Sequence, residues 1–308
     1  MNSPKTTGPI DRTKLKTPKK DSWLRSLFIA MLLAGLIRTS FAGAYRVPSG
    51  SMKNTLLVGD YLFVNKIGYF IETPKYIPFT SVEIPHLHVK TWDVKRGDVV
   101  VFEYPGDRDE VVSHKGDENY IKRCVGLPGD VVQIVNKQLY VNGKAFANPP
   151  ESILSNDTLR AGLVDPRIFP RGAKWNIDNF GPLRIPKKDD VVAISMDNID
   201  KWEVFIEREG HKVERGMNDQ ILIDGKSASA YKVQRDYLWM MGDSRDNSED
   251  SRIWGFAPMD NVIGSGSIIY WSWYDPPTSG AAAIGDGYDP DEVQKFQIRW
   301  DRIGRLIH

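Results

Sequence analysis

An uncharged apolar segment, SLFIAMLLAGLI, runs from Ser26 to Ile37, between Arg25 and Arg38. Its twelve residues are too few to cross the hydrocarbon core of a bilayer, which takes about 20. A helix over residues 23–44 reaches that length if both arginines extend their charged ends to the membrane interfaces. The pattern therefore predicts an N-terminal hydrophobic helix that acts as a membrane anchor over residues 23–44.

Two other interpretations of this segment stay open on the local pattern. The small residues Ala42, Gly43 and Ala44 follow the apolar run, as in the exit site of a cleavable secretory signal. A buried core helix of a cytosolic protein is the third interpretation, but the basic leader over residues 1–22 argues against it. The anchor interpretation and the signal interpretation predict the same orientation: the leader stays in the cytoplasm, and the chain after residue 44 is exported.

Beyond residue 44 the pattern is that of β-strands. Aromatic and β-branched residues dominate YLFVNKIGYF (61–70) and SIIYWSWY (267–274), and VKRGDVVVFEYPGD (94–107) encloses a short apolar run between Gly and Pro. The N-G pair at 142–143 and the D-G pair at 224–225 predict hairpin turns. We expect a mainly β fold: an antiparallel β core over 45–143 and 233–308, with an inserted smaller β lobe over 144–232.

Composition and charge narrow the class of protein. The 308 residues, 41% hydrophobic and 26% charged, are typical of a folded globular chain. The net charge is +1, and seven of the basic residues fall within residues 1–25, so the body lacks the clustered basic face of a nucleic-acid-binding protein. The single cysteine, Cys124, excludes an intramolecular disulfide and is predicted to be a small buried hydrophobe. No nucleotide-binding glycine motif occurs.

Two serines, Ser49 and Ser51, lie in the turn VPSGSM (47–52). A serine hydroxyl is a weak nucleophile unless a base removes its proton. Histidine is the usual base, but none of the five histidines lies beside a G-x-S-x-G nucleophile elbow. His86 and His88 could face one side of a strand as metal ligands, yet no third ligand cluster accompanies them, so we predict no metal site.

A lysine can replace histidine as the base when burial disfavours its charged form. Lys122 lies in the predicted strand NYIKRCVG (119–126), where Tyr120 and Cys124 share its face and Ile121 and Val125 occupy the other. Taken alone, this stretch also fits a surface lysine that extends its ammonium into solvent. Both interpretations stay open at this point.

The stretch GDSRDNSEDSRIWG (242–255) interleaves serines with aspartates and arginines. A solvated turn is its simplest interpretation. A calcium loop is a second one, but the spacing of the aspartates does not match the EF-hand pattern. Alternatively, paired Asp and Arg side chains would fix a tight turn and direct one hydroxyl inward.

Four of these stretches, in this order and after a hydrophobic segment, resemble the motifs of bacterial type I signal peptidases, also called leader peptidases. They are PSGSM (48–52), RGDVVVF (96–102), YIKRCVGLPGD (120–130) and GDSRDNSEDSRIWGF (242–256). The resemblance extends over about residues 45–265. The leader and the inserted lobe contribute little to it.

The resemblance implies a role for each matching residue. Ser51 falls on the nucleophile and Lys122 on its general base, and Ser49, together with the backbone N–H of Ser51, on the oxyanion hole. Ser248 falls on the serine that orients the lysine amine, and Asp250 and Arg252 on the pair that supports it. The substrate pockets for small side chains correspond to Tyr45, Val47, Met52, Leu56, Tyr120 and Ile121.

The same resemblance implies an uncleaved single-pass anchor in the bacterial inner (plasma) membrane, with the N-terminus cytoplasmic and the catalytic domain on the periplasmic or extracytoplasmic face. Its substrates would be the signal peptides of exported preproteins, cut after A-x-A. Its other expected partner is the lipid bilayer, with no nucleic acid. We expect a monomer that needs no metal and no organic cofactor.

Two other functions remain to be distinguished from this one. A self-cleaving serine-lysine protease of the SOS-repressor type would carry a DNA-binding helix-turn-helix at its N-terminus, where this chain has a basic leader and an apolar segment. A non-catalytic membrane-tethered β scaffold would carry Ser51 and Lys122 by coincidence.

Overall fold

The structure is a computed structural model that describes residues 23–30, 42–66, 69–72, 82–83, 88–116, 118–150, 152–216, 218–274 and 297–308. Residues 23–30 are helical, and Trp23, Leu24, Leu27, Phe28 and Ile29 expose their apolar side chains. Within the described residues, no helix has the length and apolarity that a membrane crossing requires. The remainder of the proposed anchor up to Phe41 lies outside the described residues.

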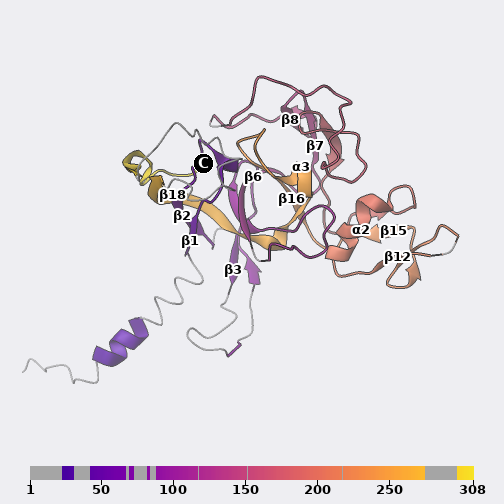
Figure 1. The fold of residues 1–308 in the computed structure, drawn as a ribbon. Helices are drawn as coiled ribbons and strands as arrows, with labels where there is room; N and C mark the ends of the chain where they lie inside the picture. The colour runs from indigo at the N-terminus through magenta and orange to yellow at the C-terminus, as the bar shows by residue number, and fades with distance from the viewer. Residues whose placement is uncertain are drawn as a thin grey trace, which may run out of the picture.

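The main sheet is antiparallel and is built from strands that lie far apart in the sequence (Figure 1). Its strand order is β1 (Ala42–Arg46), β2 (Asp60–Asn65), β18 (Val262–Tyr274), β5 (Val99–Glu103), β6 (Asn119–Gly126), β16 (Tyr237–Met241) and β17 (Ala257–Pro258), and β19 (Gln297–Ile298) pairs with β18. The long strand β18 pairs with both β2 and β5 and shifts register on each side. Such bulges bend and twist a strand, which lets the sheet curl. The prediction of a mainly β fold is therefore confirmed.

The sheet begins before the expected boundary at residue 44. Ala42 pairs with Asn65 and Ala44 with Phe63, so three of the residues assigned to the anchor belong to β1.

Smaller sheets lie beside the main one. They are β10 (Phe180–Arg184), β7 (Val131–Val135), β8 (Gln138–Val141) and β9 (Lys144–Ala145); β11 (Val191–Ala193) with β15 (Ala230–Lys232); β12 (Val213–Arg215), β13 (Ile221–Ile223) and β14 (Lys226–Ser227); and β3 (Phe70–Glu72) with β4 (His88–Lys90). Both predicted hairpin turns are confirmed, with positive φ at 142–143 and 224–225. Because β10 pairs with β7, part of the stretch assigned to the inserted lobe completes a sheet that begins in the stretch assigned to the core.

The helix α2 (Ile199–Arg208) was not anticipated from the sequence. It buries Ile199, Trp202, Phe205 and Ile206, a spacing of three and four residues that places them on one face. In Figure 1 it lies with β12 and β15 in a group to one side of the main sheet. The inserted stretch is therefore mixed α and β.

The buried side chains form three clusters, and β6 contributes to each of them. Cys124 belongs to a cluster with Phe102 and Trp254, Val125 to the largest cluster, and Ile121 packs against the third. Cys124 is fully buried, and this burial raises the pKa of its thiol, as predicted for a small buried hydrophobe. The strand that carries Lys122 is thus held by the core along its length.

Candidate active site

Ser51 lies on η1 (Gly50–Met52), a single 3-10 turn that follows β1. The segment before the turn is tied to β2, because the N–H of Val47 donates to the carbonyl of Asp60 at 2.9 Å and that of Gly59 to the carbonyl of Val47 at 3.1 Å. Met52 is fully buried and fixes the end of the turn. The Ser51 side chain therefore has a defined position, with 7% of the residue exposed.

Lys122 reaches Ser51 from β6. Its Nζ lies 2.7 Å from Ser51 Oγ, within hydrogen-bonding distance, although the two residues are 71 positions apart in the chain. Lys122 is 4% exposed, so the interpretation as a surface lysine is wrong. The residue lies opposite Val100 of β5, and its Nζ is 5.2 Å from the centre of the Tyr120 ring.

Burial lowers the pKa of Lys122 from 10.5 to about 8. The nearby carboxylates of Asp250, Glu249 and Asp243 raise it and oppose this effect. Desolvation dominates because removing an ammonium from water penalises its charged form. A substantial fraction of Lys122 is therefore neutral near pH 8, as a general base requires.

Ser49 lies beside the same hydroxyl. Its Oγ is 3.4 Å from Ser51 Oγ, and the residue precedes η1 in an extended conformation. Ser49 is exposed, so its hydroxyl is accessible from the cleft. This position allows it to contact a group that reacts with Ser51.

The loop after β16 closes the back of the site. The N–H of Ser244 donates to the carbonyl of Ser51 at 3.0 Å. A Cβ on Gly242 would lie 2.5 Å from the same carbonyl oxygen and 2.2 Å from Ser248 Oγ. Only glycine fits there without displacing one of the two serines.

Ser248 Oγ is buried and has no hydrogen-bond partner among the described residues. The expected contact between this hydroxyl and the amine of Lys122 is therefore absent from the described geometry. Its proximity to Gly242, which also lies against Ser51, still places Ser248 near the site.

Two buried ion pairs hold this loop. Asp250 binds Arg252 through two bonds, from Nε at 2.9 Å and from Nη2 at 2.8 Å, and accepts the N–H of Gly242 at 3.2 Å. Asp243 binds Arg123 in the same bidentate way, at 2.8 and 2.7 Å. The second pair was missed from the sequence, although Arg123 follows Lys122 directly and Asp243 lies in the acidic stretch.

The cleft in front of Ser51 and Lys122 is a cavity of about 470 Å³. Four of the six expected pocket residues line it, namely Tyr45, Val47, Tyr120 and Ile121. Met52 and Leu56 do not line it; both are fully buried and pack with Val47 in the core beneath. Leu62 and Val101, which the sequence did not single out, also line the cavity.

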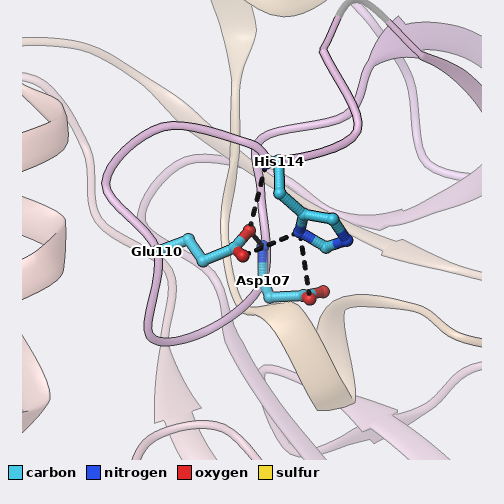
Figure 2. A group of neighbouring side chains, drawn as sticks. All are labelled: Asp107, Glu110 and His114. Atoms are coloured by element: carbon cyan, nitrogen blue, oxygen red, sulfur yellow. Dashed lines mark hydrogen bonds and ion pairs between the residues drawn. The ribbon is translucent and has the colours of Figure 1, made fainter.

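Asp107, Glu110 and His114 form a separate cluster in the loop between β5 and β6 (Figure 2). Their ligand atoms lie close enough together to hold a metal ion, but His114 Nδ1 is 2.7 Å from Glu110 Oε1 and 3.7 Å from Asp107 Oδ2. The hydrogen bond with Glu110 raises the pKa of His114, and the contacts of the imidazole with the two carboxylates account for the geometry of the cluster. Of the other two histidines considered as ligands, His88 lies on β4 and His86 is outside the described residues.

The chain is similar to known proteins over most of its length. The family model described as signal peptidase, peptidase S26, matches residues 20–271. Signal peptidase I of Pseudomonas fluorescens is 30% identical, covering 86% of this chain and 77% of the relative. The corresponding protein of Buchnera aphidicola subsp. Schizaphis graminum is 32% identical over 81% and 74% of the two chains. That of Helicobacter pylori is 28% identical over 93% and 91%.

Proposed function

The chain belongs to the signal peptidase family, peptidase S26, and is a signal peptidase I, a serine endopeptidase; from this premise we propose that Ser51 is its nucleophile and Lys122 its general base. The observation that carries the proposal is the 2.7 Å approach of Lys122 Nζ to Ser51 Oγ. Both residues are buried, and the pKa of the lysine is lowered to about 8. These are the conditions under which a lysine can activate a serine hydroxyl.

In the proposed first step, neutral Lys122 takes the hydroxyl proton while Ser51 Oγ forms a bond to the scissile carbonyl carbon. The oxyanion is held by the Ser49 hydroxyl and the backbone N–H of Ser51. The tetrahedral intermediate then breaks its C–N bond, and the new lysinium gives its proton to the leaving amine. Water, deprotonated by the same lysine, hydrolyses the acyl-enzyme and releases Ser51.

The cleft supports a specificity for small side chains before the cut, as in A-x-A. Its apolar lining includes Tyr45, Val47, Tyr120 and Ile121. Met52 and Leu56 are fully buried and pack in the same cluster as Val47. They thereby support the bottom of the cleft and limit its depth. Substrate pockets of limited depth on such a floor accept alanine and reject larger residues.

Signal peptidases I act on signal peptides and are typically membrane-bound. We propose that residues 23–44 anchor this chain in the bacterial inner (plasma) membrane in a single pass, with residues 1–22 in the cytoplasm. The catalytic core (45–143 and 233–308) and the inserted lobe (144–232) would lie on the periplasmic or extracytoplasmic face, with one chain per functional unit. The apolar side chains exposed on the helix at residues 23–30 support the anchor.

The test uses the full chain in detergent and a preprotein whose signal ends in A-x-A. Wild-type protein is expected to cut after the second alanine, mapped by sequencing the new N-terminus. Ser51→Ala and Lys122→Ala are expected to show no cleavage. Two exposed residues provide controls, Ser227→Ala on β14 and Lys232→Ala on β15.

Each outcome distinguishes the alternatives. A wild-type chain that leaves the preprotein intact would favour the non-catalytic scaffold. Cleavage of its own body in place of the preprotein would favour the repressor type. Cleavage by Ser51→Ala or Lys122→Ala at the wild-type rate would remove the proposed pair while leaving the family assignment intact.

A further inference from the structure

The catalytic cleft is lined by charged groups that the proposed chemistry does not use. Two glutamates, Glu118 and Glu249, and one arginine, Arg46, line the same cavity as Ser51 and Lys122. Glu118 directly precedes β6, and Glu249 lies in the loop after β16, between Ser248 and Asp250. Both glutamates are exposed, Glu249 with 52% of its side chain accessible. Two carboxylates therefore face solvent in the space that substrate would occupy. Arg46, at the end of β1, is the cation among these groups, and its Cζ lies 6.0 Å from the centre of the Tyr61 ring.

The carboxylate of Glu249 acts electrostatically on two residues of the cleft, Lys122 and Tyr120. It raises the pKa of Lys122 and also that of the Tyr120 hydroxyl. Both residues line the cavity. A charged substrate side chain in that cavity would experience the same field, attractive for a cation and repulsive for an anion.

Lys115 opposes this carboxylate from outside the cavity. Its Nζ lies 3.6 Å from Glu249 Oε2 and donates to the Tyr120 hydroxyl at 3.0 Å. It also lies 5.0 Å from the centre of the Tyr104 ring. The Lys115 ammonium thus contacts Glu249, the Tyr120 hydroxyl and the Tyr104 ring. At its distance of 3.6 Å it offsets only part of the negative charge of the Glu249 carboxylate.

From this arrangement, and resting on the proposed function, we infer that Glu249 makes the cleft select for a basic side chain and against an acidic one beside the scissile bond, and that Lys115 limits this selection. Exposed charge pairs in water interact weakly, so we expect a preference of about fivefold. Removal of Lys115 should increase the preference, and removal of the Glu249 charge should abolish most of it.

The experiment measures kcat/KM for matched preproteins that end their signal in A-x-A. Lys or Glu is placed in turn at the middle position of A-x-A and at the first and second positions after the cut, and a neutral Gln serves as reference. The readout for each enzyme is the ratio of kcat/KM for the Lys preprotein to kcat/KM for the Glu preprotein. A change in the pKa of Lys122 alters both values alike and therefore cancels in this ratio. Wild type is compared with Glu249→Gln, Glu118→Gln and Lys115→Met.

The matched control is Glu214→Gln. Glu214 also pairs with a lysine, Lys212, at 2.6 Å, but it lies on β12 away from the cleft. We expect wild type to favour Lys by about fivefold in at least one position, Glu249→Gln to reduce that ratio to near one, and Lys115→Met to raise it. About 1 M salt should also reduce the wild-type ratio, because screening weakens exposed charges.

Two results would overturn the inference. One is a wild-type ratio near one at all three positions. The other is a ratio that Glu249→Gln leaves unchanged, which includes the case in which only Glu118→Gln alters it. In either case cleavage of the neutral preprotein, and its loss in Ser51→Ala, would still support the proposed function, so the two failures are distinguishable.

Discussion

Replacing Lys122 with Met is expected to abolish cleavage and to stabilise the fold at pH 7. Methionine fills similar space without a charge, and Lys122 is only 4% exposed. Burial lowers the pKa of this lysine from 10.5 to about 8. The folded protein therefore holds the proton less tightly than the unfolded chain does, which penalises folding wherever the unfolded lysine is charged.

The size of this penalty follows from the two pKa values. The difference between 10.5 and about 8 corresponds to about 3 kcal/mol, at about 1.4 kcal/mol per pH unit. Loss of the hydrogen bond with Ser51 removes about 1 kcal/mol, so the net gain is about 2 kcal/mol. The penalty is complete below pH 8, shrinks as the pH rises towards 10.5, and is absent above that value.

The assay is urea unfolding of the full chain in detergent, followed by tryptophan fluorescence at pH 7 and near pH 10.5. The control is Lys232→Met, because that lysine has 67% of its side chain exposed and should show no comparable gain. The reasoning would be refuted if Lys122→Met were less stable than wild type at pH 7. It would also be refuted if the gain were equal at both pH values.

Three further outcomes are expected. In wild type, kcat/KM should rise about tenfold per pH unit up to about pH 8 and then level off, because the proposed base, Lys122, has a pKa of about 8; a rate that does not change between pH 6 and 9 would contradict this. Gly242→Ala should lower kcat/KM by about 100-fold while the circular dichroism spectrum is retained, since its Cβ would approach Ser248 Oγ to 2.2 Å and the Ser51 carbonyl to 2.5 Å; a loss below threefold would argue against this packing. Arg208→Met should lower kcat/KM by about tenfold, because Arg208 donates to two carbonyls of the β5–β6 loop at 2.5 and 2.8 Å; unchanged kinetics would show that α2 does not position this loop.

The local pattern of the chain was sufficient for most of the strands. Alternating and short apolar runs located β2, β5, β6 and β18, and the N-G and D-G pairs located two hairpins, because two-residue turns depend on local backbone conformation. The helix α2 was missed because its apolar residues include a short continuous run, Val204 to Ile206, in KWEVFIE. Such a run also fits a buried strand, and only packing of the helix against the core distinguishes the two.

Other parts of the site were decided by contacts between distant segments. From the sequence, Met52 and Leu56 could be named as pocket residues. The sequence could not show whether they line the cavity or lie buried beneath it, because apolar residues occupy both kinds of position. The ion pair of Arg123 with Asp243 joins residues 120 positions apart. No local pattern identifies such a partner.

The sequence by itself determined which serine and which lysine to consider, and that the chain is mainly β with an apolar segment near its N-terminus. It left open whether Lys122 is a base or a surface residue. Tertiary structure excluded the surface residue by burying Lys122, and the pKa that the proposed base requires depends on its hydration and on nearby charges. At Lys122 these are set by the burial of β6 and by Asp243, Glu249 and Asp250 from the loop after β16.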